Sequence, residues 1–384
     1  MSTFRNQLER YLIDTLIKSS DGGVADAAVF SHSDQQLALD QRLPIQLLKP
    51  LADEIKNIAQ GYTNNREITI PQLSSNACRA YALYYTLINF EKIERLLSAH
   101  LPLLPSRPLK VLDYGCGPGT AAFALAAAHP DPFSLTAVDA NPAMRQIAKT
   151  LLQPLTGIGK ISTLKINPAD ASDSYPQAAY DLILAGHVFN EFAANEQQRL
   201  IGEFLRSLTP DGTLVIIESA LQAQTREIMA LRDFILDQDR TLEVAFPCTH
   251  RALCPMLKEP EQWCHGPLSW NPPHLIRQLD QLTGFNKHRI KYSAFIFTRN
   301  HAAIQQKRGE FRVVAPPSSS KRGDLLHLCG ETFYGETLLS KRARAENNIE
   351  FRRADHFDCI SAPVEHRITS MLDGTIPISR TRAP

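Results

Sequence analysis

Three of the chain's seven cysteines lie within one stretch of twenty residues, PCTHRALCPMLKEPEQWCHG, which begins at Pro247. Five residues separate Cys248 from Cys254, nine separate Cys254 from Cys264, and a fourth thiol, Cys329, follows in LLHLCGE. Four thiolates can bind a zinc ion or an iron–sulfur cluster. The wide spacing lacks the paired C-x₂-C knuckles typical of zinc sites, and it suits a cluster held between two segments.

Two other interpretations of this stretch stay open. His250, His265 and His327 lie close in sequence to these cysteines, so a mixed Cys/His zinc site is possible. The thiols could also be unconnected packing residues, because free cysteine is often buried. That is the interpretation we give to Cys78 and Cys359.

A second candidate site is the glycine-rich stretch VLDYGCGPGTAAFAL, which holds Asp113, Gly115, Gly117 and Gly119. Glycines allow a tight turn and a close approach to a ligand. The dinucleotide fingerprint requires a glycine where Thr120 stands. The pattern acid-x-Gly-x-Gly-x-Gly instead resembles motif I of the S-adenosylmethionine-dependent methyltransferases. That resemblance implies that the loop lies under the methionine part of the cofactor and that Asp113 helps to hold its amino end.

Further polar residues follow the next strands of the same region. Asp139 ends the second strand, where a carboxylate can accept hydrogen bonds from both ribose hydroxyls. Asp170 follows the third strand, where the resemblance implies a group near the adenine. His187, Asn190 and Glu191 are expected at the cofactor edge of the sheet. We include His187 among the cofactor-binding candidates, and no convincing general base emerges, so the catalytic residues are unknown.

The elements that must position these residues read as an alternation of strands and helices from Leu109 onward. Such alternation indicates a parallel sheet with helices on both faces. We therefore predict an α/β fold of the class I S-adenosylmethionine-dependent methyltransferase type, with an N-terminal helical region and a small β-rich C-terminal domain. The predicted boundaries are 1–105 for the helical region, 106–304 for the methyltransferase-like domain with a cysteine-bearing insertion at 245–270, and 305–384 for the basic C-terminal region.

Two short motifs resemble catalytic signatures but stand in the wrong place. NPPH at 271–274 is similar to the Asn-Pro-Pro-aromatic motif of amino-methylating enzymes, which belongs directly after the fourth strand. We interpret it as a helix start with prolines in the first turn. Pro247-Cys248 resembles the nucleophile of cytosine-5 methyltransferases and is equally displaced. The C-x₃-C-x₂-C spacing of radical methylating enzymes is absent from the sequence.

The charge distribution is uneven although the net charge is only +1. Residues 1–250 carry 21 Lys and Arg against 27 Asp and Glu, whereas residues 251–384 carry 20 against 13. The basic C-terminal part suggests an anionic partner. No apolar run is long enough for a membrane helix, and the polar N-terminus does not resemble a signal peptide. We expect a cytoplasmic, bacterial-type protein without a disulfide framework.

The most specific resemblance depends on the order of several motifs: VLDYGCGPGTA, DLILAGHVFNEF, VIIESA, PCTHRALCP, WCHGPLSW and LLHLCGE. Over roughly residues 75–335 this order resembles the Rsm-type methyltransferase-like proteins, which are mitochondrial small-ribosomal-subunit assembly factors with bacterial relatives. The resemblance implies that Cys248, Cys254, Cys264 and Cys329 ligate a [4Fe-4S] cluster. It also implies binding to the small ribosomal subunit and its rRNA, and it leaves methyl transfer open.

The sequence departs from that family pattern in two places. An aromatic and basic run usually follows the third cysteine, and here the sequence reads HGPLSWNPPH. The Pro-Gly that often follows the glutamate of the fifth strand is replaced by Ser219-Ala220. These changes bear on the local RNA contacts and the substrate site, and they leave the four cysteines in place.

Three functions therefore compete. The first is an rRNA-binding assembly factor of the small ribosomal subunit, with Arg342, Arg344, Arg352 and Arg353 as candidates for contact with phosphates. The second is an active RNA or protein methyltransferase with a structural zinc. The third is a small-molecule methyltransferase that binds no nucleic acid. No oligomeric state is predicted.

Overall fold

The structure is a computed structural model of the 384-residue chain. It describes residues 3–18, 30, 42–63, 72–169, 174–304, 310–331, 333–340, 349–361, 369–372 and 379–381. The chain forms two compact units, each built from two segments. Unit 1 contains Met1–Glu191 and Leu268–Ile290, and unit 2 contains Phe192–Pro267 and Lys291–Pro384.

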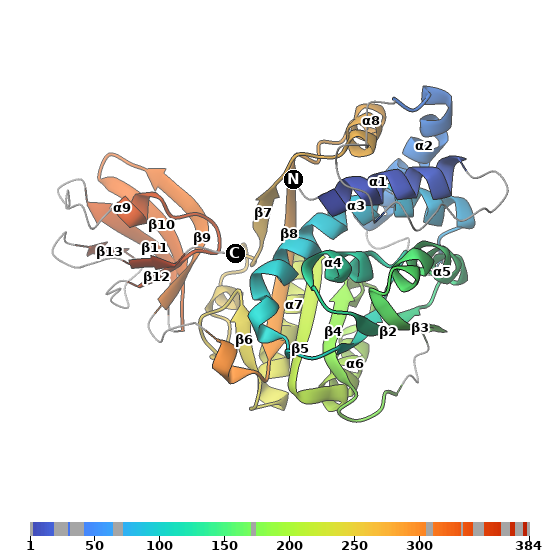
Figure 1. The fold of residues 1–384 in the computed structure, drawn as a ribbon. Coiled ribbons are helices and arrows are strands. Elements are labelled where there is room, and N and C mark those ends of the chain that lie inside the picture. Colours follow the sequence, from blue (N-terminus) through green and yellow to red (C-terminus); the bar gives the residue numbers. More distant parts are fainter. Residues whose placement is uncertain are drawn as a thin grey trace. The chain divides into compact units, whose positions relative to one another are not determined.

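Unit 1 combines N-terminal helices with the first four strands of the methyltransferase-like region (Figure 1). Its elements are α1 (Thr3–Ile13), η1 (Asp14–Lys18), α2 (Ile45–Thr63), α3 (Ser75–His100), η5 (Leu101–Leu103), β1 (Leu109–Tyr114), α4 (Thr120–Ala128), β2 (Phe133–Asp139), α5 (Pro142–Gly157), β3 (Ile161–Pro168), β4 (Tyr180–Gly186), η6 (Phe189–Glu191) and α8 (His274–Thr283). The strands pair in the order β3-β2-β1-β4, and the pairs β1–β2, β1–β4 and β2–β3 are parallel. The alternation read from the sequence is thus confirmed.

Helix boundaries in unit 1 follow local sequence signals. Ser74 caps α3 by accepting a hydrogen bond from the backbone amide of Ala77. Asn141 caps α5 by accepting from Ala143 and Met144, and Pro142 fills the first helical position. The expectation that NPPH begins a helix is also confirmed, because α8 starts at His274; its prolines, however, precede the first turn, with Pro273 at the N-cap.

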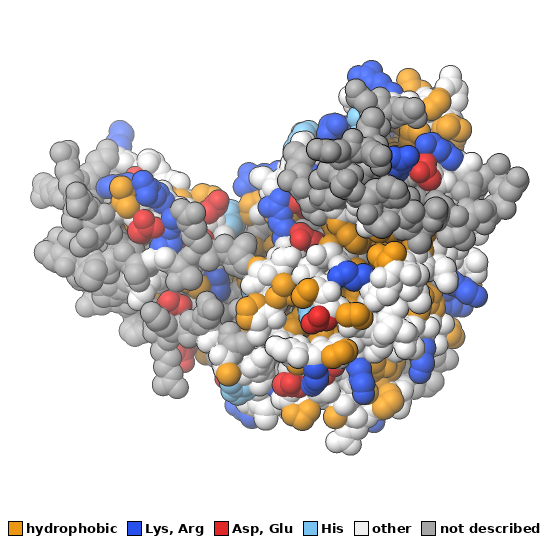
Figure 2. All heavy atoms as spheres, in the orientation of Figure 1, with side chains coloured by type: hydrophobic (Ala, Val, Ile, Leu, Met, Phe, Trp, Pro, Cys, Tyr) orange, Lys and Arg blue, Asp and Glu red, His pale blue; other side chains and the backbone are white. Residues whose placement is uncertain are grey.

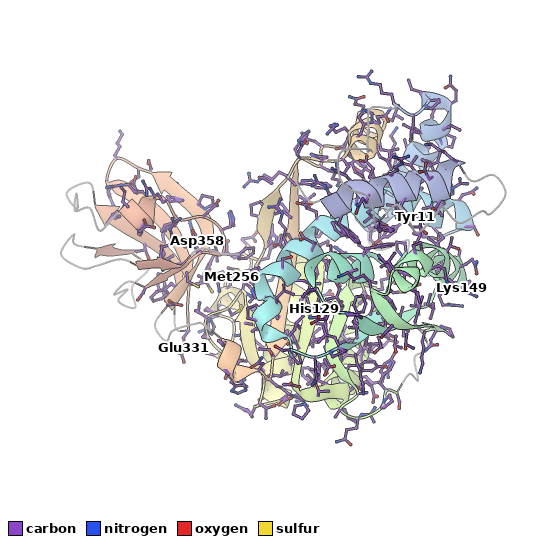
Figure 3. All side chains as sticks on the ribbon, viewed as in Figure 1. Tyr11, His129, Lys149, Met256, Glu331 and Asp358 are labelled. Carbon is purple, nitrogen blue, oxygen red and sulfur yellow. The ribbon has the colours of Figure 1, made fainter. Side chains whose placement is uncertain are left out.

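The N-terminal helices pack on the methyltransferase-like layer rather than forming a separate body. α3 contacts both α4 and α5 within unit 1. Tyr11 of α1, labelled in Figure 3, donates its hydroxyl to the carbonyl oxygen of Thr150 on α5 at 3.1 Å. Its ring also lies near that of Phe123 on α4. The predicted helical region therefore provides one wall of the unit that holds the glycine loop.

Unit 2 holds the later strands and the C-terminal sheet (Figure 1). Its elements are α6 (Ala194–Ser207), β5 (Leu208–Ser219), α7 (Gln222–Gln238), β6 (Glu243–Phe246), η7 (Pro255–Lys258), β8 (Arg289–Thr298), η8 (His301–Ala303), β9 (Glu310–Ser319), β10 (Gly323–Cys329), β11 (Tyr334–Ser340), α9 (Ile349–Arg352), β12 (Cys359–Ser361), β13 (Thr369–Leu372) and β14 (Ser379–Thr381), and β7 (Gly266–Ser269) leads back toward unit 1. The first strands pair in the order β5-β8-β6, with β8 antiparallel to both neighbours. The sequence KYSAFIFTR (291–299) thus lies mostly within β8, which pairs in antiparallel fashion with β5 and β6.

The C-terminal part forms a six-stranded sheet of order β13-β11-β10-β9-β12-β14. All of its pairings are antiparallel except β11–β13. One face of the sheet covers a small core that includes Val313, Leu326, Leu328, Phe351 and Ile360. The alternation along β10 therefore turns Cys329 to the opposite face from Leu328. The predicted β-rich C-terminal region is confirmed, as is the α/β methyltransferase-like fold.

Candidate functional site

The glycine loop joins β1 to α4 through three residues in the left-handed region of the backbone. Gly115, Gly117 and Gly119 have φ values of +71°, +51° and +88°. A Cβ on Gly115 would lie 2.7 Å from Val188, and one on Gly119 would lie 2.8 Å from Leu152. A Cβ on Gly117 would meet no atom within 4 Å. Gly115 and Gly119 therefore serve the packing of the turn, whereas Gly117 leaves open space that a ligand can enter.

Asp113 lies directly before this turn with its side chain buried and only partly hydrogen-bonded. Its Oδ2 has no hydrogen-bond partner among the residues that the structure describes. Burial, together with the smaller effect of the nearby Asp139 carboxylate, raises the pKa of this carboxyl from 3.8 to about 7. A cationic group of a ligand would both supply the missing hydrogen bond and favour the carboxylate.

Asp139 is held by the backbone on both sides of its carboxylate. Its Oδ2 accepts from the amide of Gly117 at 2.8 Å, and its Oδ1 accepts from the amide of Asn141 at 2.8 Å. Burial raises its pKa, and these two hydrogen bonds oppose the rise. Asp139 thus fixes the glycine loop, a role that the sequence reading missed. Its predicted contact with ribose hydroxyls stays a prediction, and Asp170 lies outside the described residues.

His187 follows β4 with a φ of +60° and contacts a buried lysine from the N-terminal helices. Its Nε2 lies 3.3 Å from Nζ of Lys92 on α3, and that ammonium also donates to Oδ1 of Asn89 at 2.8 Å. Burial lowers the pKa of His187 well below its usual value, and the Lys92 charge lowers it further. The imidazole is therefore neutral, and its Nε2 can accept a hydrogen bond from the Lys92 ammonium. Lys92 was not singled out from the sequence, because nothing in a lone lysine on a helix marks it as buried.

These residues fit S-adenosylmethionine, the cofactor that the loop resembles. The unpartnered carboxyl oxygen of Asp113 suits an amino group, and the open space over Gly117 suits a ligand lying against the backbone. When bound, this cofactor supplies an activated methyl group. The cofactor would then be held by residues of this loop, either by direct contact or by fixing the conformation of the turn: Asp113, Gly115, Gly117, Gly119 and Asp139.

The four predicted thiols all lie in unit 2 and are free. Cys248 follows β6, Cys254 precedes η7, Cys264 precedes β7, and Cys329 ends β10. Figure 3 labels Met256 beside the second of these and Glu331 close after the fourth. Burial raises the pKa of Cys264 well above its usual value, and the other three thiols raise it further. The four sulfur atoms therefore lie within electrostatic range of one another.

Their arrangement is not that of a site for a single ion. Within the described ranges, no group of three or more His, Cys, Asp or Glu side chains is placed to hold one metal ion. Of the histidines that kept a mixed zinc site open, His265 stacks on the Trp263 ring and His327 lies 3.3 Å from a carboxylate oxygen of Glu336. The identity of a metal or cluster at the cysteines stays a prediction.

Helix α7 holds the cysteine-bearing loop with one stripe of side chains. Arg226 donates to three loop carbonyls, those of Leu257, Glu259 and Gln262. The carboxylate of Asp233 accepts from the amide of Cys254 at 3.0 Å. Further along the same stripe, the Met229 sulfur and the Arg232 guanidinium also contact the loop. Helical spacing of these residues was the signal that could have revealed the stripe.

Two buried arginines accompany the thiols. Arg232 and Arg312 are 1% and 7% exposed, and the Nε of each has no hydrogen-bond partner in the described structure. Unpaired buried N–H donors are costly unless an acceptor is present. Four thiolates around a cluster would supply anionic sulfur acceptors for these two donors, so the residues present fit a thiolate-bound cluster.

Comparison with known proteins places this geometry in context. The model of the family described as "Mitochondrial small ribosomal subunit Rsm22" matches residues 75–356. A relative from Schizosaccharomyces pombe, Rsm22-cox11 tandem protein 2, mitochondrial, is 24% identical over 266 residues, which are 64% of this chain and 32% of that protein. The chain thus spans about a third of the length of the curated relatives it matches first. Trans-aconitate 2-methyltransferase of Streptomyces coelicolor is 31% identical over 120 residues, covering 31% of this chain and 38% of that enzyme.

Two methyltransferases are among the solved structures that are similar to this chain. The plantazolicin methyltransferase BpumL, in complex with a desmethyl analogue and SAH, has a TM-score of 0.38 at 15% identity, over 66% of this chain and 98% of that one. A TehB-like S-adenosylmethionine-dependent methyltransferase from Corynebacterium glutamicum has a TM-score of 0.32 at 18% identity, over 64% and 98%. The family match covers the glycine loop and all four cysteines. This chain therefore belongs to the Rsm22 family of methyltransferase-like proteins.

Proposed function

We propose that this chain is an S-adenosylmethionine-binding factor that acts in assembly or translation on the small ribosomal subunit, contacts its rRNA, and carries a four-cysteine [4Fe-4S] cluster. The observation that carries the proposal is the single family match over residues 75–356, which includes both candidate sites. The name of that family supports the ribosomal part. The burial and mutual electrostatic influence of the four thiols support the cluster.

Contact with rRNA is supported by the basic C-terminal part of the chain. Lys321 and Arg322 lie exposed in the turn between β9 and β10, and Arg352 and Arg353 are exposed on and after α9. Arg352 also pairs with Asp324 at 2.7 Å. Figure 2 shows Lys and Arg side chains interspersed with Asp and Glu on the face that it presents. Arg342 and Arg344 lie outside the described residues.

The location of the protein is a separate question. No helix among the described residues has both the length and the apolarity that a membrane crossing requires. The names of the Schizosaccharomyces pombe relatives place those proteins in mitochondria. A bacterial-type cytoplasmic location for this chain stays a prediction.

Two measurements on the full chain test the proposal. Anaerobically purified protein should be brown and contain about four irons with matching sulfide, as a Cys₄-ligated [4Fe-4S] cluster requires. A colourless protein with one zinc would contradict the cluster. Co-sedimentation with immature small subunits should weaken as salt rises, because phosphate contacts release counterions. Binding that is absent at low salt would contradict the ribosomal assignment.

A catalytic role is favoured by one specific observation, the neutral His187 imidazole beside Lys92 at the edge of the cofactor site. If methyl transfer occurs, immature small subunits should accept a methyl group from the wild-type chain and none from Gly117→Arg, which fills the open space over the loop. Loss of subunit binding by Gly117→Arg as well would assign the cofactor a structural role. The small-molecule alternative, which similarity to trans-aconitate 2-methyltransferases keeps open, predicts no salt-dependent RNA binding.

A further inference from the structure

Arg232 is built into the wall of the cysteine-bearing loop. It lies on α7 with 1% of its surface exposed, and it donates to the carbonyl oxygen of His250 at 2.5 Å and to that of Ala252. Both carbonyls lie between Cys248 and Cys254 in the chain, so the guanidinium is held on the inner side of that turn. Its Nε is buried and has no hydrogen-bond partner among the residues that the structure describes.

Arg312 occupies the corresponding place beside the fourth thiol. It lies on β9 directly opposite Cys329 of β10 in the antiparallel register. Its guanidinium lies 5.8 Å from the ring centre of Phe246, which is two residues before Cys248, and it donates to the carbonyl oxygen of Phe357. Here too the Nε is buried without a partner. Arginines from a helix and from a strand thus approach the thiols from two elements distant in sequence.

We propose that Arg232 and Arg312 are positioning residues for the sulfur centre: they neutralise its charge and donate N–H hydrogen bonds to its sulfur atoms. The inference rests on the proposed four-thiolate centre. Four thiolates around a core of two positive charges, either zinc or an oxidised cluster, leave two negative charges. The two guanidinium groups oppose that charge, and Arg232 is shared with the carboxylate of Asp233, whose Oδ1 lies 2.6 Å from a guanidinium nitrogen.

Arg226 provides a matched control. It lies on the same helix stripe as Arg232 and donates to three carbonyls of the same loop, but it is partly exposed and all three bonds point to the segment between Cys254 and Cys264. A purely structural clamp predicts that Arg226 and Arg232 have the same effect on the centre. A charge-balancing role predicts that only Arg232 and Arg312 alter its electronic properties.

The experiment compares full-length Arg312→Gln, Arg232→Gln, Arg312→Lys and Arg226→Gln with the wild type. In anaerobic protein the cluster potential is measured by electron paramagnetic resonance during a reductive titration. Reduction adds negative charge, so loss of a neighbouring positive charge should make reduction harder. We expect each Gln variant at 232 or 312 to lower the reduced-to-oxidised ratio about tenfold at fixed potential, which is about 59 mV for a one-electron couple. Arg312→Lys and Arg226→Gln should stay near the wild-type value.

The two proposals fail in distinguishable ways. Iron, sulfide and zinc analysis of the wild type decides the cluster by itself. If the centre proves to be zinc, the same variants are compared by competition with a chelator, and we expect about tenfold weaker zinc binding for Arg312→Gln but not for Arg226→Gln. Should Arg312→Gln and Arg232→Gln load metal yet keep the wild-type potential and affinity, the arginines are structural only. Should Arg226→Gln shift the potential equally, charge balance is also refuted.

Discussion

The glycine loop in unit 1 and the cysteine-bearing loop in unit 2 are held in place by opposite means. The glycine loop is fixed by its own main chain, since the amide of Gly117 donates to Asp139 and three glycines adopt left-handed backbone angles. The cysteine-bearing loop contains no such glycine, and side chains of α7 hold it in place. One of them, Arg226, donates to three of the loop's carbonyl oxygens. The first site therefore depends on backbone conformation, and the second on charged side chains.

The two regions also differ in what they leave unsatisfied. Near the glycine loop a buried acceptor lacks a donor, namely Oδ2 of Asp113. Near the cysteines two buried donors lack acceptors, the Nε atoms of Arg232 and Arg312. A site short of donors favours a cationic ligand group, and a site short of acceptors favours an anionic centre. The contrast agrees with the proposed cofactor amino group in the first region and with the proposed thiolate-bound centre in the second.

The largest expected effect is a loss of bound metal, and it should distinguish the four proposed ligands from a fifth cysteine of unit 2. Cys264→Ser should abolish the metal or cluster, because burial and three neighbouring thiols favour a shared centre at that position. Cys359 is also buried and lies opposite Arg312 in the strand register, but it is outside the proposed ligand set. Cys359→Ser should keep full metal content by elemental analysis. Equal loss of metal in both variants would contradict the ligand assignment.

The second largest effect is a loss of stability when glycines of the loop are replaced, which tests whether the loop depends on their backbone conformation. Gly115→Ala combines a left-handed φ with a Cβ 2.7 Å from the β-branched Val188, and we expect a loss of about 3 kcal/mol in unfolding free energy. Gly117→Ala meets no neighbouring atom and should lose only about 1–2 kcal/mol. Its cofactor affinity should nevertheless fall, since the new methyl group occupies the open space.

The two tryptophans allow this comparison to be made unit by unit. Trp270 lies in unit 1 and Trp263 in unit 2. In a Trp263→Phe background, urea unfolding followed by Trp270 fluorescence reports unit 1 alone. Equal destabilisation by Gly115→Ala and Gly117→Ala would show that contact with Val188 has no role.

Much of this architecture could be predicted from the sequence because it depends on local signals. The glycine spacing of the loop, the strand–helix alternation and the proline start of α8 are all short-range patterns, and each is confirmed as structure. The proposed set of four cysteine ligands depends instead on the density of three of them in the sequence and on the family resemblance, and it stays a prediction. Whether they ligate a cluster remains a prediction.

What could not be predicted depends on register between distant elements. Arg312 lies opposite Cys329 only because β9 and β10 pair in one particular register, which shifts twice along its length. A one-residue slip would place Arg312 on the other face of the sheet. The contact between Lys92 and His187 likewise joins residues 95 positions apart. Periodicity shows that a helix or strand exists, but not which neighbour each buried charge meets.

A third effect concerns the buried acceptor of the first region. Because the folded pKa of Asp113 is about 7 and its ordinary value is 3.8, the folded state binds this proton more tightly than the unfolded state does. Stability of unit 1 without cofactor should therefore fall as pH rises from about 4 to about 7, by on the order of 2–4 kcal/mol. Asp113→Asn should remove this dependence, measured by Trp270-monitored unfolding at several pH values.

The Asp113→Asn variant also tests whether this carboxyl binds the amino group of S-adenosylmethionine. S-adenosylmethionine should stabilise the wild type at pH 7.5 and stabilise Asp113→Asn less, because the neutral amide cannot pair with an amino group. Asp131→Asn, at an exposed position before β2, should behave as the wild type. An unchanged pH profile in Asp113→Asn would show that the carboxyl is not the group that titrates.

The smallest expected effect tests the side-chain support of the cysteine loop. Arg226→Met removes three hydrogen bonds to partly solvated carbonyls, so we expect a loss of about 1–2 kcal/mol in unfolding free energy. Arg240→Met, which removes an exposed ion pair with Asp237 near the end of the same helix, should cost less than about 0.5 kcal/mol. In a Trp270→Phe background the Trp263 fluorescence follows the loop itself, since its indole donates to the carbonyl of Ala220. If Arg226→Met is as harmless as Arg240→Met, the loop is held chiefly by what its cysteines bind, and α7 would then be a neighbour of the site rather than its frame.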